Sequence, residues 1–530
     1  MKKFWKTGEP CVLATGAALA VILVMTLTLV GVVISNGFGF FWPRELVRLE
    51  LKDGGIVLGQ VMAREKNPVN GTRRLQLKVS NRDLYGQDFR WIDEQDITGR
   101  SVPADAVLVE RREHGNFTGF LTGLSIEGLA TATTGNLHET LEKARQAIKE
   151  KLAEEQVIRS RMTRLNERAE RLRLKLLSLE YRGRQAAEIA EMTATREKLL
   201  AEFNTLNDQA AALHAAIARH SAQMTDATGT AKDIPLVDIV RVQQPNSMSF
   251  VAKTAAYASK LRELLFDDPR ESNTEGGLFP AIFGTVMMVM LMSVFSLPFG
   301  VIAAVYLREY ARDGIMTRLV RIAVNNLAGV PSIVYGVFGL GFFVYGVGGG
   351  IDKLLFPERL PTPTFGTGGI LWSSLTLALL TVPVVIVATE ESLASIPRGI
   401  REGSLALGAT RFQTLTRILL PMATPGIMTG LILAMARAAG EVAPLMVVGV
   451  VKLAPSLPFD LNFPFFHMDR KFMHLGFHIY DVGFQSPNVE AAKPMVYITT
   501  LLLLAIVIIA CSTAIYLRNQ MRRKYTTSNF

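Results

Sequence analysis

The sequence predicts a polytopic α-helical membrane protein with one large domain inserted outside the membrane. Three observations predict this fold class: six long apolar runs, a charged central segment of water-soluble character, and basic residues that flank the runs. The chain has 530 residues, of which 49% are hydrophobic, and a net charge of +10. An apolar run of about 20 residues is long enough to cross a bilayer as a helix.

The basic excess lies next to the apolar runs, where charge orients membrane segments. Lys2, Lys3 and Lys6 precede the first run. A second cluster follows the last run and comprises Arg518, Arg522, Arg523 and Lys524. This placement favours membrane lipid as a partner over nucleic acid, to which a basic chain could otherwise be assigned.

The first run, residues 11–34, follows a basic start. A cleaved signal peptide is the alternative, but the run is too long for a typical signal and no small-residue cleavage site follows it. We therefore interpret residues 1–36 as a cytoplasmic N-terminus with a retained anchor. The two cysteines, Cys11 and Cys511, are too close to the chain ends to staple the central domain.

Residues 37–136 have the pattern of a β-rich module. Residues 46–51 alternate apolar and polar side chains, Asp53-Gly54-Gly55 forms a turn, and residues 56–61 resume the alternation. Further strands are expected at residues 75–79 and 106–110.

Residues 137–224 predict a coiled coil. Apolar residues follow steps of four and three on both sides of Gly183. They are Ile158, Met162, Leu165, Ala169, Leu172, Leu176 and Leu179, and then Leu199, Phe203, Leu206, Ala210, Leu213 and Ile217. The seam loses phase at residues 181–184, which favours an antiparallel hairpin over one continuous helix that pairs with another chain.

Residues 225–275 return the chain to the membrane. A strand is expected at 233–242, and residues 251–266 form a short amphipathic segment. This segment could lie along the membrane surface or be an ordinary soluble helix.

Residues 276–520 contain the other five predicted spans, at 279–306, 327–347, 369–389, 426–451 and 496–516. With six spans both termini fall on one side, and residues 521–530 form a cytoplasmic tail. Two connections predicted to be cytoplasmic are rich in arginine, while the loop 348–368 has only Lys353 and Arg359 as positive residues. The distribution places residues 37–278 outside the cytoplasm, in the periplasm of a bacterial cell.

No enzymatic motif is found in the chain. It has no Gly-x-x-x-x-Gly-Lys-Ser/Thr nucleotide loop, no His-Glu-x-x-His and no Cys-x-x-Cys. His467, His474 and His478 stand among aromatic and apolar residues, which favours a packed loop over a metal site. We therefore expect no enzyme activity, no metal and no cofactor in this chain.

The segment 390–421 is polar, punctuated by glycine, and lies on the predicted cytoplasmic side. An acid, small residues, a glycine and a distal Leu-Pro follow a spacing that an ordinary loop seldom keeps. We expect a short helix that presents a face to a cytoplasmic partner. The residues assigned to this role are Arg401, Glu402, Gly403, Ser404, Gly408, Ala409, Leu420 and Pro421.

This segment resembles the coupling loop of ABC-importer membrane subunits, and further motifs narrow the resemblance. The chain resembles the PstA-type permeases of the phosphate-specific ABC importer, closely over residues 275–520 and loosely over the first anchor. The similar motifs are Gly-Gly-Leu-Phe-Pro-Ala-Ile-Phe-Gly-Thr at 276–285, Leu-Ala-Gly-Val-Pro-Ser-Ile-Val-Tyr-Gly at 327–336, Val-Pro-Val-Val-Ile at 382–386 with Thr-Glu-Glu at 389–391, and Ala-Arg-Ala-Ala-Gly-Glu-Val-Ala-Pro-Leu at 436–445.

The resemblance implies an ABC type I importer permease fold and a set of partners. These would be a homologous second permease (PstC-like), two ATP-binding subunits (PstB-like), which use ATP and Mg, and a periplasmic phosphate-binding protein (PstS-like). Compact members of the family have only a short loop where this chain has residues 37–270, so the family implies no role for that domain.

Arg437 and Glu441 are candidates for the substrate path. If the fifth span begins at Gly426, Arg437 lies roughly 16 Å into the membrane, where charge is costly and faces a polar path or a partner. Arginine donates two parallel hydrogen bonds to an oxyanion, and a carboxylate can accept the proton of hydrogen phosphate, which sulfate lacks. The alternative is a self-neutralising pair that only holds the helices together.

Four polar residues in or just before the third span are further candidates for this path: Asn325, Asn326, Ser332 and Tyr335. Such residues also bind helices to one another. Two other functions stay open: import of a different oxyanion, and a membrane-anchored periplasmic scaffold or sensor that acts through its coiled coil.

Overall fold

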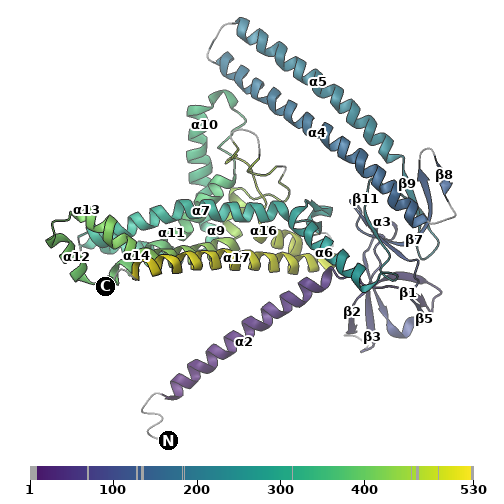
Figure 1. Cartoon of the computed structure of the whole chain (residues 1–530), viewed down its shortest axis with the longest axis horizontal. Coiled ribbons are helices and arrows are strands. Elements are labelled where there is room, and N and C mark those ends of the chain that lie inside the picture. Colours follow the sequence, from purple (N-terminus) through teal and green to yellow (C-terminus); the bar gives the residue numbers. More distant parts are fainter. Residues whose placement is uncertain are drawn as a thin grey trace. The chain divides into compact units, whose positions relative to one another are not determined.

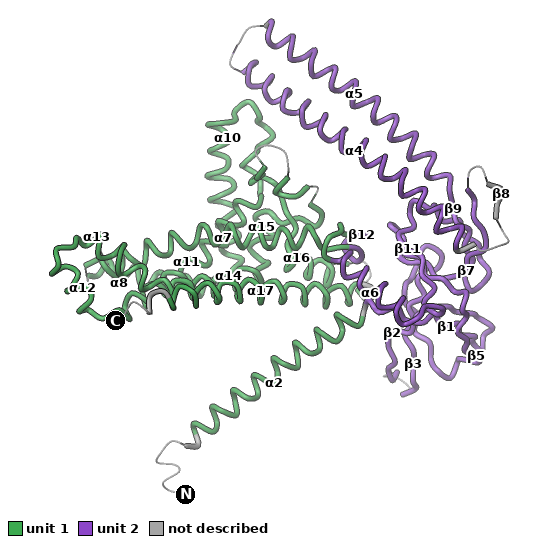
Figure 2. The backbone as a smooth tube through the Cα atoms, viewed as in Figure 1, with its two compact units in different colours: residues 1–40, 265–269, 277–530 green, residues 41–264, 270–276 purple. Residues whose placement is uncertain are grey.

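The computed structural model divides into two compact units, described separately (Figures 1 and 2). Unit 1 comprises residues 1–40, 265–269 and 277–530, and unit 2 comprises residues 41–264 and 270–276. The structure describes residues 9–67, 71–126, 129–132, 137–181, 183, 186–312, 314–454, 456–460, 465–486 and 489–526. The predictions that concern Lys2, Lys3, Lys6 and Arg184 lie outside these residues.

Within the described residues, unit 1 has six helices that are long and apolar enough to cross a membrane. They are Cys11–Gly39, Phe279–Tyr310, Ser332–Leu355, Ile370–Ala394, Arg411–Gly440 and Ala492–Arg523. Two predicted spans, 11–34 and 496–516, lie inside longer helices, because apolar runs mark only the part of a helix that suits lipid, and two others, 279–306 and 369–389, each extend one residue past a helix end. These helices are α2 (Glu9–Phe40), α7 (Phe279–Val305), α11 (Ile370–Ala394) and α17 (Val489–Thr526).

The third span begins later than predicted. Residues 315–327 form a separate amphipathic helix, α8 (Ile315–Leu327), and the span starts at Ser332 after Pro331. The residue before a proline is pushed out of the helical region, so helix α8 cannot continue through Val330. The span then runs through α9 (Ser332–Phe338), the π-helical η4 (Gly339–Gly348) and α10 (Gly349–Leu355).

The predicted fifth span, 426–451, was wrong at both ends. Helix begins at Arg411, where the Thr410 hydroxyl and the Gln413 side chain form a reciprocal capping box. It continues through α13 (Arg411–Thr414), η6 (Leu415–Leu419) and α14 (Leu420–Gly440). It stops at Gly440 because Glu441 is extended (φ −76°, ψ 132°), and α15 (Ala443–Val448) starts anew with Pro444 in its first turn.

Small residues let the helices of unit 1 approach closely. A methyl group placed on Gly430 of α14 would come within 2.6 Å of the Ala388 side chain on α11. One placed on Gly300 of α7 would come within 2.6 Å of Val385, also on α11. Close backbone approach of this kind is how helices associate in lipid, where hydrophobic burial offers no driving force between them.

Unit 2 contains two antiparallel sheets. One has the order β4-β3-β2-β1-β5 and a core that includes Leu49, Leu75 and Leu77. The other has the order β10-β9-β7-β6-β11, with β8 on β7, and a core that includes Phe117, Leu141 and Met224. The strands are β1 (Leu46–Leu51), β2 (Ile56–Lys66), β3 (Arg73–Lys78), β4 (Phe89–Asp93), β5 (Ile97–Ser101), β6 (Val107–Arg111), β7 (Phe117–Ile126), β8 (Leu129–Ala132), β9 (Ser221–Thr225), β10 (Ala231–Pro235) and β11 (Ile239–Gln243).

Two long helices stand between β8 and β9 and lie side by side (Figure 1). They are α4 (Leu137–Tyr181) and α5 (Ala186–Ala218), and they pack antiparallel through Met162 and Leu165 against Leu206 and Ala210. The apolar seam is interrupted by Glu155, which is buried and bound to Arg159 at 2.6 Å.

The remaining elements are short or connect the two units. They are α3 (Arg82–Tyr85), η1 (Glu94–Asp96), α6 (Phe250–Phe266), β12 (Pro269–Arg270), η2 (Glu271–Asn273), β13 (Glu275–Gly276), η3 (Tyr306–Tyr310), η5 (Pro357–Arg359), α12 (Arg398–Ala406), α16 (Leu475–Tyr480) and η7 (Asp481–Gln485).

A buried ion pair fastens α3 to the second sheet of unit 2. Arg111 donates to both carboxylate oxygens of Asp83, at 2.8 and 3.1 Å, and to the backbone carbonyls of His114 and Gly115. The Lys232 ammonium lies 2.5 Å from the same carboxylate. Burial alone would raise the pKa of Asp83, but the hydrogen bonds and charges of Arg111 and Lys232 hold it well below its usual range.

Candidate functional site

Arg437 lies in the last turn of α14, about level with the middle of α11. The two helices run antiparallel, with Gly426 against Ser392 and Gly430 against Ala388. Continuing this register places Arg437 level with about Thr381, and α11 extends from Ile370 to Ala394. Arg437 is thus level with the middle of a candidate membrane helix, although its own span begins earlier than the sequence estimate assumed.

Glu441 contacts Arg437 from outside the helix. Its backbone is extended, so the two residues do not share one helical face, although they are four positions apart in the sequence. Arg437 Nε lies 3.4 Å from Glu441 Oε1, and the two side chains are 33% and 19% exposed. Among the described residues, the two terminal nitrogens of Arg437 have no protein partner. The planar end of the guanidinium is thus free to donate to a ligand.

The four polar candidates in or just before the predicted third span divide into two groups. Tyr335 is buried on α9, and its hydroxyl donates to the Leu327 carbonyl at 2.7 Å, which occupies its proton. Ser332 is half-buried at the first position of α9. Asn325 and Asn326 are exposed on α8, a helix separate from the span, which begins at Ser332.

Gly336, next to Tyr335, holds α9 against the segment that follows Glu441. A methyl group on Gly336 would come within 2.7 Å of the Pro444 Cα. Only glycine allows this approach, so α9 and α15 fix the backbone on one side of the Arg437–Glu441 pair.

His474 holds the backbone on another side of the pair and was not predicted to do so. It is fully buried, and its Nδ1 accepts hydrogen bonds from the backbone N–H groups of Gly476 and Phe477, at 3.1 and 3.3 Å. A methyl group on Gly476 would come within 2.9 Å of Val442, the residue after Glu441. A lone histidine in a loop gives no sequence signal for this capping role.

The other two histidines of this region, His467 and His478, each have a protein partner. His467 contacts Asp460 at 3.1 Å, and His478 contacts Thr499 at 3.2 Å. Among the described residues, no three His, Cys, Asp or Glu side chains gather in a way that could hold a metal ion.

In the segment 390–421, two of the predicted residues hold α12 to the bundle. Arg401 donates to the carbonyls of Leu393 and Ile396 at the end of α11, and to Glu309 at 3.0 Å. Ser404 is buried and shares a 2.9 Å hydrogen bond with Thr414. These two residues therefore position the helix instead of presenting its outer face.

Other residues of the segment form an exposed surface. Glu402 and Gly403 are exposed on α12, and Gly408 has φ +85°, the left-handed conformation that turns the chain toward α13. Leu405, Leu407 and Phe412 are 44%, 91% and 66% exposed. Ala409, Leu420 and Pro421 are half-buried, and Leu420 packs against a core cluster that includes Leu393 and Leu415.

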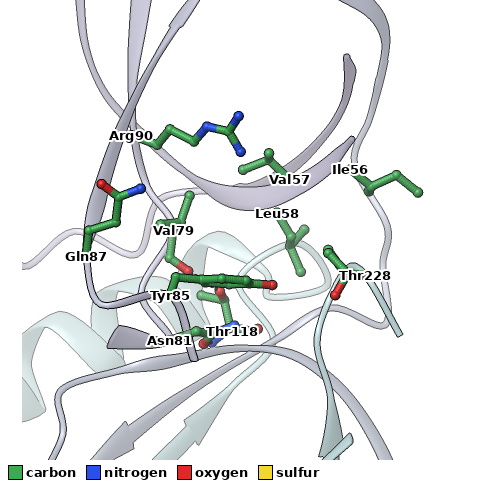
Figure 3. A pocket seen from close by; sticks show the side chains of 11 residues that line it. Ile56, Val57, Leu58, Val79, Asn81, Tyr85, Gln87, Arg90, Thr118 and Thr228 are labelled. Atoms are coloured by element: carbon green, nitrogen blue, oxygen red, sulfur yellow. Dashed lines mark hydrogen bonds between the residues drawn. The ribbon is translucent and has the colours of Figure 1, made fainter. Parts of the chain in front are cut away.

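Unit 2 has a cavity of about 180 Å³ that the sequence did not predict (Figure 3). Val57, Leu58 and Val79 line it with apolar side chains, and Tyr85 and Arg90 add polar groups. The Tyr85 hydroxyl is bound to Asp226, and burial with this hydrogen bond raises the pKa of Tyr85 to about 12. The cavity belongs to the inserted unit alone.

The family model described as "Binding-protein-dependent transport system inner membrane component" matches residues 296–523. The phosphate transport system permease protein PstA of Mycobacterium leprae is 33% identical, over 43% of this chain and 67% of its own length. The probable ABC transporter permease protein YqgI of Bacillus subtilis is 32% identical, over 41% of this chain and 70% of its own length. The chain belongs to this permease family, as a member of the PstA type.

Membership confirms the predicted permease fold for the membrane part and identifies a transport subunit. The match lies wholly within unit 1, so unit 2 is an addition that the family model does not describe. The chain spans about three fifths of some relatives, for example 59% of the Bacillus subtilis protein YqgH, at 34% identity. A chain of the MetNI methionine ABC transporter aligns over 47% of this chain and 95% of its own, at 19% identity and a TM-score of 0.33, too low to add to the fold assignment.

Proposed function

We propose that this chain is a membrane permease subunit of an ATP-driven importer of inorganic phosphate in the bacterial inner membrane. Both termini would be cytoplasmic and residues 37–278 periplasmic, as the arginine-rich connections suggest. Several relatives are named phosphate permeases, which supports the choice of substrate. Import would proceed by alternating access of a path between this chain and a homologous PstC-like permease.

The observation that carries the proposal is the Arg437–Glu441 pair. Arg437 has one long contact, leaves its terminal nitrogens free, and stands level with the middle of α11. Arginine binds phosphate through two parallel charge-assisted hydrogen bonds. Glu441 supplies the carboxylate that can accept the proton of hydrogen phosphate, and sulfate has no such proton to offer.

Energy would come from partner subunits. The exposed side chains of Leu405, Leu407 and Phe412, with Glu402 and Gly403 beside them, form a surface suited to a cytoplasmic ATPase. Two PstB-like subunits would bind ATP and Mg there, and a PstS-like protein would deliver phosphate from the periplasm. This chain itself would bind no cofactor and catalyse no reaction.

Replacing Arg437 tests the proposal directly. We expect Arg437→Gln to reduce phosphate uptake at least about 100-fold, because losing two charge-assisted hydrogen bonds removes about 3 kcal/mol or more of binding at the path. Uptake of radiolabelled phosphate is measured in cells in which the assembled complex is quantified. Arg518→Gln is the matched control, since Arg518 is also half-buried in a span but binds Thr429 at 3.3 Å. Normal uptake by assembled Arg437→Gln would refute the assignment.

A further inference from the structure

Unit 2 has an aromatic cluster at the point where the chain leaves the first span. Trp42 packs against Phe250 and Tyr257 of α6, with ring centroids 5.6 and 6.2 Å apart, and Phe41 packs against Tyr257 at 6.5 Å. All four rings belong to unit 2. Their mutual packing fixes the start of α6 beside residues 41–42.

The position of this cluster along the membrane normal follows from the covalent chain. The first candidate span ends at Gly39, so Trp42 is three residues beyond it and at most roughly 11 Å away. The interfacial layer on each side of the hydrocarbon core is about 5–7 Å thick. Trp42, and Phe250 which packs against it, are therefore within reach of the lipid headgroups.

The outward face of α6 is apolar where it approaches this layer. Phe250 and Val251 are 72% and 74% exposed, which is costly for such side chains in water. Ala255, Ala258 and Ser259 continue the exposed stripe at helical spacing, before any charge appears at Arg262. Over more than its first two helical turns, the exposed stripe carries no charged side chain.

The opposite face of α6 is fixed to unit 2 by charge. Lys260 binds Glu110 of β6 at 2.5 Å, and Glu263 receives a hydrogen bond from Arg241 of β11 at 3.1 Å. Both carboxylates are buried. The helix cannot roll to hide Phe250 and Val251 without breaking these pairs, so the apolar stripe is held outward.

We propose that the aromatic cluster and the exposed stripe of α6 insert into the headgroup region of the membrane and anchor unit 2 to the lipid surface. Trp and Tyr rings are enriched at this depth because one edge is apolar and the other polar. The apolar face of such a helix sits roughly 5–10 Å into the headgroup boundary. The anchor does not depend on the transported substrate or on which side of the membrane unit 2 occupies.

The test measures the environment of Val251 in the full chain in nanodiscs of phosphatidylethanolamine and phosphatidylglycerol. Val251→Cys is made with Cys11→Ser and Cys511→Ser and labelled with a small fluorophore. Val157→Cys in the same background is the control, because Val157 is an exposed apolar residue on α4, at 66% exposure. Aqueous iodide and lipids carrying a nitroxide near the headgroup serve as quenchers.

We expect iodide to quench the label at 251 at least about fivefold less than at 157, and nitroxide lipid to quench only the label at 251, because an inserted face is shielded from water. Equal iodide quenching at both positions would overturn the proposal. Shielding from iodide without lipid quenching would also overturn it, since protein would then cover the stripe. Adding Trp42→Ser and Phe250→Ser should lower lipid quenching at 251 about twofold or more, and unchanged quenching would refute the role of the rings.

Discussion

Arg111 in unit 2 and Arg437 in unit 1 are both largely buried, but their guanidinium groups differ in how many partners they have. Arg111 is 4% exposed and makes four hydrogen bonds, two of them to Asp83. Arg437 is 33% exposed and makes one contact, at 3.4 Å. A guanidinium has five N–H donors, so Arg111 is nearly saturated while Arg437 keeps most of its donors available. The number of N–H donors without a protein partner is therefore the property in which Arg437 fits the proposed role in ligand binding and Arg111 does not.

The largest expected effect comes from removing the partner of the saturated arginine. Asp83→Asn leaves the buried charge of Arg111 uncompensated, so the free energy of unfolding of unit 2 should fall by about 3–5 kcal/mol. Urea denaturation of the full chain in detergent, followed by protease susceptibility of residues 41–264, measures this loss. Glu139→Gln, which breaks the exposed pair with Lys143, should cost less than about 1 kcal/mol. Equal losses of unfolding free energy in the two variants would show that the buried pair stabilises unit 2 no more than the exposed pair does.

Glu441→Gln should change selectivity while leaving stability nearly intact. The amide removes the negative charge that repels sulfate and adds a donor that sulfate can use. Preference for phosphate over sulfate should fall about tenfold, which corresponds to about 1.4 kcal/mol. This preference is measured from how strongly unlabelled sulfate inhibits the uptake of radiolabelled phosphate. Glu358→Gln, a half-exposed carboxylate outside the six spans, is the control, and an identical shift in that variant would remove the special role of Glu441.

Two glycines of the segment 390–421 offer a matched pair of variants. A methyl group would meet open space at both Gly403 and Gly408, but only Gly408 has a positive φ, +85°. Gly408→Ala should cost about 1–2 kcal/mol of local stability through left-handed strain. Gly403→Ala, inside α12, should be neutral or slightly stabilising. ATP-dependent phosphate uptake should fall severalfold in the first variant alone; equal uptake in both would show that the turn at Gly408 does not matter for coupling.

The smallest expected effect concerns pH. Because the pKa of Asp83 is lowered in the folded state, its contribution to stability is present above the pKa of the unfolded chain, about 3.9, and is lost only as pH falls toward the lower folded value. The Asp83–Arg111 pair should therefore cause no difference between the urea midpoints of unit 2 at pH 7 and at pH 5. A loss at pH 5 that Asp83→Asn abolishes would show that the pair is weaker than its geometry indicates.

Sequence reasoning found the spans because lipid imposes long apolar runs, and it found the β-rich and helical parts of unit 2 because periodicity differs between them. It misplaced the limits of the third and fifth spans. Pro331 and the capping residue Thr410 decide those limits through local backbone geometry, and apolar content does not report that geometry.

The candidate site was predictable only in part. An arginine and a glutamate inside an apolar run are conspicuous, so Arg437 and Glu441 were identified. Their contact across a helix end, the capping by His474 and the approach of Gly336 to Pro444 depend on segments distant in sequence. The free N–H donors of Arg437 could not be inferred from the sequence, because the number of donors in use depends on which acceptor groups the fold brings close to the guanidinium.

The α4–α5 hairpin has a mechanical consequence. A continuous helix of 45 residues is a stiff rod roughly 65 Å long. Because the rod is held at its base by the sheet strands, a tilt of about 5° at the base displaces the tip by roughly 6 Å. A molecule bound at the tip would therefore be displaced farther than the base moves. A force applied at the tip would exert a torque on the base.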